Sequence, residues 1–265
     1  MAKRPTAKKK LRMAFIGAGG IAGTHMRYLA EMDDVALVAL ADISEDAMAG
    51  RAEEFGIDAA FTDYRKMLRE VKPDAVSVCT PNGMHARASI AASTAGADVL
   101  VEKPMAMNAR EAQGMIDAAK KSHRKLVIGF QHRYDPRTQF VRNAVEAGQL
   151  GKVVYARVQA LRRRGIPNWG VFGRKDLQGG GGLIDIGVHA LEMTHYAMGS
   201  PRPVAASGII SIHWAVKRIK HKSARAAVIP DKRPRPPELI LIMDWPIMAH
   251  PPIAPKKPHV KLARP

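Results

Sequence analysis

The stretch Leu11-Arg-Met-Ala-Phe-Ile-Gly17-Ala-Gly19-Gly20-Ile-Ala22-Gly23-Thr-His25 decides the fold of this chain. A short apolar run enters a glycine cluster of the form G-x-G-x-x-A, and a helix-like segment follows it. A second apolar run, Val35–Ala41, then leads to Asp42, roughly 20 residues after the glycines. This spacing predicts a βαβ unit that binds a dinucleotide, and a glycine-rich turn followed by a surface Asp42 is the alternative.

Each position of the glycine cluster has its own physical role. Gly17 permits the tight turn from strand to helix, and Gly19 lacks a Cβ atom, so a pyrophosphate can approach the backbone. Gly20 and Ile21 lie where a helix expected over about residues 21–32 begins, and we assign them to the same cofactor site. Ala22 takes the place of the third glycine and is small enough for close helix–strand packing. The free N–H groups of this helix start would face the phosphates.

Asp42 predicts which dinucleotide binds. Its carboxylate can accept hydrogen bonds from both hydroxyls of a ribose, and it would repel a 2′-phosphate. Ile43 and Ser44, which follow it, do not supply the basic residue that a 2′-phosphate usually requires. NAD is therefore the expected cofactor, in preference to NADP.

Composition narrows the class of protein. A chain of 265 residues can form one large domain or two smaller ones, and a hydrophobic content of 46% suits a globular protein. The single cysteine, Cys79, excludes an internal disulfide framework and favours a reducing, cytoplasmic location. We expect no secretory signal, no membrane-spanning segment and no metal site.

The net charge of +18 suggests nucleic acid at first sight, but its position argues against that class of partner. Residues 1–12 and 209–265 together carry fifteen of these net charges, while residues 13–208 are nearly balanced. We therefore expect no specific nucleic-acid binding by the folded part. Non-specific affinity for polyanions, carried by the two ends, is the alternative.

Strand and helix signals alternate between residues 13 and 131, which predicts an α/β fold with a doubly wound parallel sheet. Ser44, Asp63 and Asn108 are the expected helix caps, and Gly96 is an expected helix stop. The expected helices cover residues 44–56, 63–71, 85–95 and 108–122, and the expected strands cover residues 75–79, 98–101 and 125–130.

The pattern changes after Phe130 and again after Gly208. Residues 132–208 predict part of an α+β domain, with helices over 136–147 and 183–198 and strands over 152–161 and 204–207. Residues 209–265 hold ten of the 18 prolines and no sustained alternation, so we expect a largely irregular tail. A shift of reading frame near Gly208, followed by an early stop, is the simplest hypothesis for this change. The chain is thus divided into a basic tail (1–12), a nucleotide domain (13–131), a partial substrate domain (132–208) and an atypical tail (209–265).

Several ordered motifs lie between residues 12 and 208. They are the glycine cluster with His25, Ala41-Asp42, Thr80-Pro81-Asn82 with His85, Glu102-Lys103-Pro104, Gly129-Phe-Gln-His-Arg133-Tyr-Asp-Pro136, and Gly180-Gly-Gly-Leu-Ile-Asp185-Ile-Gly-Val-His189. Together they resemble the glucose–fructose oxidoreductase, inositol dehydrogenase and rhizopine-catabolism family of NAD(P)-dependent sugar oxidoreductases.

The resemblance implies a nucleotide domain followed by a domain with an open sheet, which often makes a homo-oligomer. It implies a catalytic set that falls on Lys103, Asp185 and His189, and a cis bond before Pro104. It also implies cofactor contacts, which fall on Thr80, Pro81, Asn82, His85 and Glu102. The later strands of the second domain are not recognisable here, which puts the oligomer contacts in doubt.

The chemistry of the catalytic set agrees with the residue types. Oxidation of a secondary alcohol needs a base for the hydroxyl proton, and a neutral imidazole such as His189 suits that role. Asp185 lies four residues earlier, so on a helix it shares a face with His189 and could fix the ring or bind the same hydroxyl. Lys103 follows a parallel strand, at the edge where such sheets bind ligands, and could stabilise an alkoxide. A surface Asp–His pair and a Lys103–Glu102 ion pair are the alternatives.

Other residues keep two interpretations. Arg133 could shape a substrate pocket or cover the junction between the domains. Trp169 could stack on a sugar or serve as a lid or packing residue. His85 could contact the ligand or cap its helix. His25 could take part in chemistry or only pack against the cofactor loop.

We therefore expect an oxidoreductase that transfers a hydride between NAD and a secondary hydroxyl of a sugar, polyol or related small molecule. Two alternatives remain open. One is a relative that keeps NAD bound and uses transient oxidation to cleave glycosides. The other is an inactive fragment that still binds dinucleotide.

Overall fold

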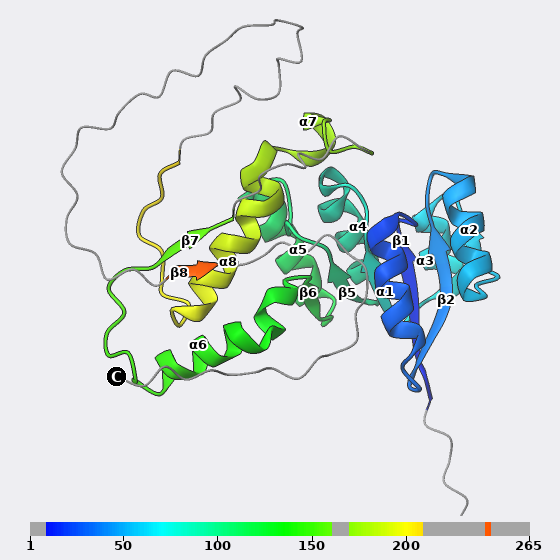
Figure 1. Ribbon diagram of the computed structural model, residues 1–265. Helices are drawn as coiled ribbons and strands as arrows, with labels where there is room; N and C mark the ends of the chain where they lie inside the picture. Colours follow the sequence, from blue (N-terminus) through cyan, green and yellow to red (C-terminus); the bar gives the residue numbers. More distant parts are fainter. Residues whose placement is uncertain (1–8, 161–169, 209–241, 245–265) are drawn as a thin grey trace, which may run out of the picture.

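A six-stranded parallel sheet forms the first part of the chain in the computed structural model, which describes residues 9–160, 170–208 and 242–244 (Figure 1). The strand order is β3-β2-β1-β4-β5-β6, the order of a doubly wound nucleotide-binding sheet. The elements are β1 (Leu11–Ile16), α1 (Gly20–Ala30), β2 (Val35–Ala41), α2 (Glu45–Phe55), β3 (Ala60–Phe61), α3 (Tyr64–Val71), β4 (Ala75–Val78), α4 (Asn82–Thr94), β5 (Asp98–Val101), α5 (Ala109–Lys121) and β6 (Leu126–Ile128). The predicted α/β fold is confirmed.

Strand alternation explains why both faces of the sheet are covered. In β1, Met13 and Phe15 point into a buried cluster with Met26 of α1 and Met48 of α2. The intervening residues of the strand point into the opposite cluster, which includes Met67 of α3 and Met115 of α5. A strand that is buried on both faces has no polar side. Its sequence therefore shows a continuous apolar run and not an alternation of polar and apolar residues.

The predicted helix caps are all present. Ser44 accepts a hydrogen bond from the N–H of Ala47 at 3.3 Å, and Asn108 accepts one from the N–H of Glu111 at 3.0 Å. Asp63 accepts one from the N–H of Arg65 at 2.8 Å. These short polar side chains satisfy N–H groups that the first turn of a helix leaves free.

Two predicted boundaries shift. Helix α4 begins at Asn82, three residues before the predicted start, because Pro81 stands just before the first turn and its fixed φ of −56° leads into it. Strand β1 begins at Leu11, so the last two residues assigned to the basic tail belong to the sheet. Arg12 is held there because its backbone N–H donates to Asp74 at 2.9 Å and its guanidinium donates to the carbonyl of Val71.

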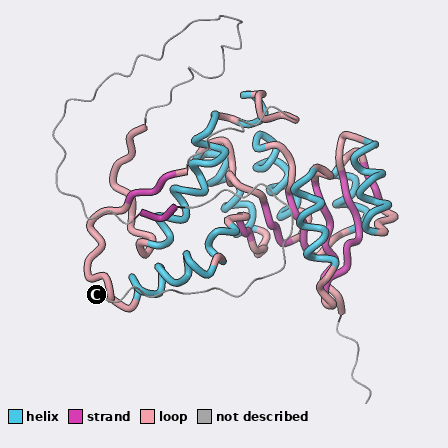
Figure 2. The backbone as a smooth tube through the Cα atoms, in the orientation of Figure 1, coloured by secondary structure: helices cyan, strands magenta, loops and turns pink. Residues whose placement is uncertain are grey.

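The second part of the chain packs around two helices, α6 and α8, which lie side by side in Figure 2. Gln139 of α6 donates to the hydroxyl of Tyr196 on α8 at 3.1 Å, and Arg142 donates to the carbonyl of Tyr196 at 2.6 Å. The elements are η1 (Gln131–Tyr134), α6 (Pro136–Glu146), β7 (Arg157–Gln159), α7 (Lys175–Gln178), η2 (Leu183–Gly187), α8 (Val188–Ala197) and β8 (Ile242–Asp244).

Several predictions for this part need correction. The strand expected over residues 152–161 is only three residues long, and the strand expected over 204–207 is absent from the described residues 201–208. The helix expected over 183–198 opens as a π-helical turn, η2, before it becomes α8. Local pattern could not show these changes, because each depends on which neighbours are present to pack against.

Strand β8 lies far along the tail and pairs in parallel with β7, with Arg157 opposite Ile242. A short parallel pair of strands therefore stands where the family resemblance implies a larger sheet. The rest of the tail, and with it the prediction that the tail is irregular, lies outside the described residues. No helix that the structure describes is long and apolar enough to cross a membrane.

Replacing Gly17 with alanine is expected to destabilise the protein. Gly17 has a φ of +101°, and an added Cβ would lie 2.6 Å from the carbonyl oxygen of Cys79. A side chain held in such a conformation costs on the order of 1–3 kcal/mol, before the clash is counted. Urea unfolding followed by circular dichroism measures the change.

Gly50→Ala is the matched control. Gly50 lies inside α2, and an added Cβ there meets no atom within 4 Å. This variant should gain about 0.5–1 kcal/mol, because alanine favours a helix interior over glycine. Equal losses in the two variants would contradict our account of Gly17.

Candidate active site

The predicted site residues follow four neighbouring strands at one edge of the sheet. The glycine turn follows β1, and Asp42 follows β2. Thr80 lies just beyond β4, and Glu102 and Lys103 follow β5. Because parallel strands end at the same edge, the fold brings these residues together in the crevice where such sheets bind ligands.

The glycine turn leaves space in front of helix α1. A Cβ added at Gly19 or Gly20 would meet no atom within 4 Å, and Gly19 has no side chain with which to cap the helix. The first N–H groups of α1 therefore remain directed at open space, as an anion site requires. Ile21 stands at the same helix start with 45% of its surface exposed. These features fit a dinucleotide pyrophosphate.

Asp42 is held in place by backbone groups. One carboxylate oxygen accepts the N–H of Ala18 at 2.7 Å, and the other accepts the N–H of Ser44 at 2.9 Å. A carboxylate oxygen has a second lone pair, so the side chain keeps capacity to accept ribose hydroxyls. Its contact with a ribose stays a prediction.

The polar side chains of Thr80 and Asn82, which follow β4, differ in whether they have a hydrogen-bond partner. The hydroxyl of Thr80 is buried without a partner among the described residues, so its hydrogen-bonding capacity is unused. Pro81 occupies the position before α4. The side chain of Asn82 is buried and donates to the carbonyl of Gln178 at 2.9 Å. Asn82 therefore attaches α4 to α7, whatever it contributes to cofactor binding.

His85 is fully buried, and both ring nitrogens face backbone carbonyls. Nδ1 lies 2.7 Å from the oxygen of Pro104, and Nε2 lies 2.9 Å from the oxygen of Thr80. Burial lowers the pKa of this ring. The side chain thus holds the two segments together and leaves no ring nitrogen for a ligand, which favours a structural role over ligand contact.

Lys103 and Asp185 meet across the two parts of the chain. The ammonium Nζ of Lys103 lies 2.9 Å from the Asp185 carbonyl oxygen and 3.0 Å from its carboxylate Oδ1. The two side chains are only 19% and 24% exposed. The bond between Lys103 and Pro104 is cis, as the family resemblance implied.

His189 stands beside this pair at the start of α8. Its Nδ1 is buried and has no hydrogen-bond partner within the described part of the chain. Burial, followed by the charges of Lys103 and His132, lowers the pKa of His189 to about 4. The imidazole is therefore neutral at pH 7 and can accept a proton. The carboxylate of Asp185 contacts Lys103, so the suggestion that it fixes the His189 ring is not what the structure shows.

His132 is a site residue to which the sequence assigned no role. Its ring meets His189 edge to face, with the ring centroids 5.0 Å apart. It lies in η1, just beyond the carboxyl end of β6, so the rule that placed Lys103 could also have found it.

Arg133 lies where the two parts of the chain join. It forms an ion pair with Glu192 of α8, and its guanidinium lies 5.0 Å from the ring centre of Tyr196. These contacts favour the junction role over the pocket role. Trp169 lies outside the described residues.

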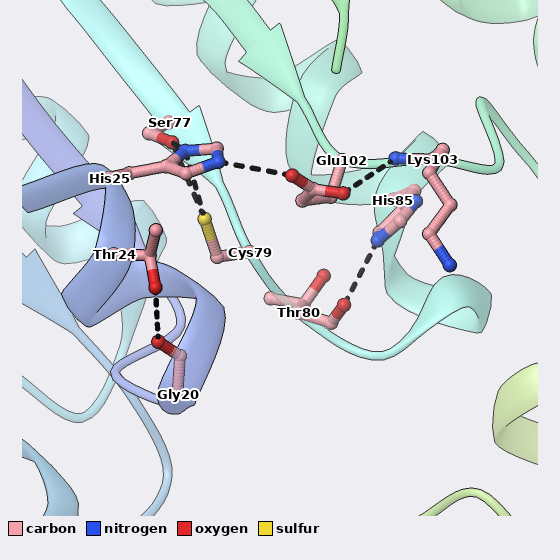
Figure 3. A network of polar contacts seen from close by, with 9 residues as sticks. All are labelled: Gly20, Thr24, His25, Ser77, Cys79, Thr80, His85, Glu102 and Lys103. Carbon is pink, nitrogen blue, oxygen red and sulfur yellow. Dashed lines mark hydrogen bonds and ion pairs between the residues drawn. The ribbon is translucent and has the colours of Figure 1, made fainter. Parts of the chain in front are cut away.

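Figure 3 shows the contacts that join helix α1 to residues 102–104 after β5, which we call the lysine loop. His25 of α1 points at Ser77 on one side and at Glu102 on the other. Glu102 in turn accepts the backbone N–H of Lys103 at 3.1 Å. His25 thus helps to hold the backbone that carries Lys103 against helix α1.

Two sequence models of one family match this chain. Residues 11–130 match its oxidoreductase domain with the NAD-binding Rossmann fold, and residues 138–221 match the GFO/IDH/MocA C-terminal domain. The chain belongs to the GFO/IDH/MocA oxidoreductase family. NAD is the cofactor of its nucleotide domain.

Named relatives of this GFO/IDH/MocA protein act on sugars and polyols. It is 42% identical over 200 residues to the D-glucoside 3-dehydrogenase of Escherichia coli, covering 75% of this chain and 57% of the relative. It is 30% identical over 234 residues to the myo-inositol 2-dehydrogenase of Thermotoga maritima, covering 84% and 69%. The chain thus spans little more than half of the glucoside dehydrogenase.

A solved structure shares the fold. The WlbA dehydrogenase from Bordetella pertussis, in complex with NADH and UDP-GlcNAcA, is 28% identical with a TM-score of 0.53. The alignment covers 54% of this chain and 44% of that one.

Gly19→Val is expected to abolish NAD binding without unfolding the protein. The backbone of Gly19 has a φ of −70°, which valine tolerates, and its Cβ would point into open space. The added side chain would occupy the place of the pyrophosphate, so we expect the Kd for NAD to rise by more than about tenfold, or 1.4 kcal/mol.

Calorimetric titration with NAD and NADP measures this effect, and the melting temperature without ligand serves as the control. The parent protein should bind NAD more tightly than NADP because of Asp42. Unchanged NAD affinity in Gly19→Val would show that the nucleotide does not lie against α1.

Proposed function

We propose that this protein transfers a hydride between NAD and a secondary hydroxyl group of a sugar or polyol. The observation that carries the proposal is the meeting of Lys103, Asp185 and the neutral ring of His189 at the nucleotide-binding edge of the sheet. A cation that can bind an oxygen and a base that can accept its proton are the two groups that alcohol oxidation requires.

The proposed mechanism divides the work among three side chains. Lys103 donates a hydrogen bond to the substrate hydroxyl oxygen and stabilises negative charge as it develops there. The neutral ring of His189 accepts the hydroxyl proton. Asp185 holds the Lys103 ammonium in place. NAD, when bound at the glycine turn, would supply the hydride acceptor.

The names of the relatives support the substrate class. A D-glucoside 3-dehydrogenase and a myo-inositol 2-dehydrogenase both act at ring hydroxyls, and they are similar to 75% and 84% of this chain. Lys103 and Asp185 face each other at 3.0 Å, so their charges are paired, which suits an uncharged polyhydroxylated ring.

Turnover of a panel of glucosides and inositols tests the proposal. NADH absorbance should rise with at least one of them, and His189→Asn and Lys103→Met should each lower kcat/KM by roughly 10²–10⁴-fold. Lys66→Gln is the control, because this exposed ammonium only faces Glu70 at 4.0 Å on α3.

Two other outcomes would contradict hydride transfer as the net reaction. Cleavage of a glucoside without accumulation of NADH would favour a glycosidase that uses NAD transiently. Tight NAD binding with neither reaction would identify an inactive fragment.

The titration of His189 provides a separate test. Its pKa of about 4 lies below the usual value of 6.5, so the ring should stay neutral from pH 8 down to about pH 5. Because the folded protein resists this protonation, His189 should contribute to a loss of stability as the pH falls from 6.5 toward 4. Nuclear magnetic resonance of the ring protons measures the pKa.

Lys103→Met should raise the pKa of His189, because it removes a neighbouring positive charge. His195 serves as an internal reference, since it lies at the far end of α8 and faces the carbonyl of Pro201. A His189 ring that titrates at 6.5 in both proteins would refute the proposed environment.

A further inference from the structure

The side chain of His25 connects three parts of the fold: helix α1, strand β4 and the loop after β5. Its Nδ1 lies 2.8 Å from the hydroxyl of Ser77, and its Nε2 lies 3.0 Å from Oε1 of Glu102 (Figure 3). The His25 and Glu102 side chains are 16% and 13% exposed. The backbone pairing of the sheet strands does not involve either side chain.

The hydrogen-bond partners of His25 determine which of its ring nitrogens carry a proton. A carboxylate can only accept, so Nε2 carries a proton toward Glu102. Burial lowers the pKa of His25, but the contacts with Cys79 and Glu102 outweigh it and raise the value to about 10. In the charged form, Nδ1 also donates to Ser77, whose own hydroxyl proton can point at the sulfur of Cys79, 3.4 Å away. Every polar atom of the group then has a partner.

Glu102 uses its second oxygen on the backbone of the lysine loop. Oε2 accepts the N–H of Lys103 at 3.1 Å. The carboxylate fits because residue 129 is glycine, where an added Cβ would lie 3.1 Å from Oε1. The His25 contact lowers the pKa of Glu102 against the effect of burial, so the group remains a carboxylate at pH 7.

We propose that His25 and Glu102 form a positioning pair that couples occupancy of the nucleotide site to the backbone of Lys103. The helix that carries His25 begins at Gly20, where the pyrophosphate binds, and His25 lies little more than one turn further on. Any change in the position of α1 is therefore passed through two hydrogen bonds to Lys103. The inference rests on the proposed function only in giving Lys103 its catalytic role.

The coupling has a consequence that does not involve turnover. When NAD orders the start of α1, the hydrogen bond from the Lys103 N–H to Glu102 should open less often. Exchange of this amide proton with solvent should then slow. A pair that only fills space would leave the response of the Lys103 amide to NAD unchanged when His25 is replaced, because Glu102 and the His85 contacts with Thr80 and Pro104 remain.

The test is hydrogen exchange of the full chain with and without saturating NAD, resolved to the Lys103 amide. In the parent protein, we expect NAD to slow this exchange by about tenfold or more, a change of 1.4 kcal/mol in the opening equilibrium. In His25→Leu, which lacks both hydrogen bonds, the effect of NAD should fall below twofold. His25→Gln keeps a side-chain N–H that can reach Glu102 and should restore part of it.

The control is Glu70→Gln, which removes a carboxylate of similar size from an exposed pair on α3. It should retain the full effect of NAD on the Lys103 amide. Should His25→Leu fail to fold, Glu102→Gln replaces it. His25 and Lys103 bond to different oxygens of Glu102, and in glutamine one of these becomes an NH2 group that cannot accept.

The kinetic signature is a fall in kcat that is larger than the rise in the KM for NAD, because the pair acts directly on Lys103 and only through α1 on the nucleotide. Equal protection of the Lys103 amide by NAD in the parent protein and in His25→Leu would overturn the coupling. NAD-dependent protection in a parent protein without hydride transfer would refute the proposed function and leave the coupling intact.

Discussion

The hydrogen bonds between Lys103 and Asp185 are the contact on which the site depends. They join residues 82 positions apart, one at the end of a parallel strand and one in the turn before α8. Removing either partner would leave a charge in a place that is mostly shielded from water, which is costly. Asn82 adds a second link nearby, through the carbonyl of Gln178. His189 on α8, the proposed base, therefore reaches the nucleotide edge because two independent polar contacts hold the second part of the chain there.

Charge alternates along the line that runs from the nucleotide helix to α8. The imidazolium of His25 faces the carboxylate of Glu102, whose neighbour Lys103 faces the carboxylate of Asp185. Each charge has an opposite partner, so attraction between neighbours offsets the cost of desolvating four ionised groups in a partly buried region. His189 lies next to this line but outside its pairs. Burial and the nearby Lys103 therefore keep its ring neutral, while every other group of the line is charged.

The sequence predicted the features that depend on near neighbours. The caps at Ser44, Asp63 and Asn108 involve residues two or three positions apart, and the turn at Gly17 is decided by its own backbone angles. What it did not predict depends on distant partners. Arg12 joins β1 because of carbonyls near residue 71, Asp185 contacts Lys103 in place of His189, and β8 pairs with β7 across 85 positions of sequence. The periodicity of a single segment carries no information about partners that lie so far away in the sequence.

The two parts of the chain differ in how completely they bury their own surfaces. The nucleotide sheet is covered on both faces by helices, whereas the second part leaves large apolar side chains such as Phe140, Val154 and Leu191 exposed among the described residues, with Val154 84% accessible. NAD binding depends on the first part, and the position of His189 depends on how α8 packs against α6. Weakening of the second part would therefore misplace His189 before it affected the nucleotide. The proposed hydride transfer thus depends on the few contacts that hold α8, whereas the nucleotide site depends on the sheet and its own helices.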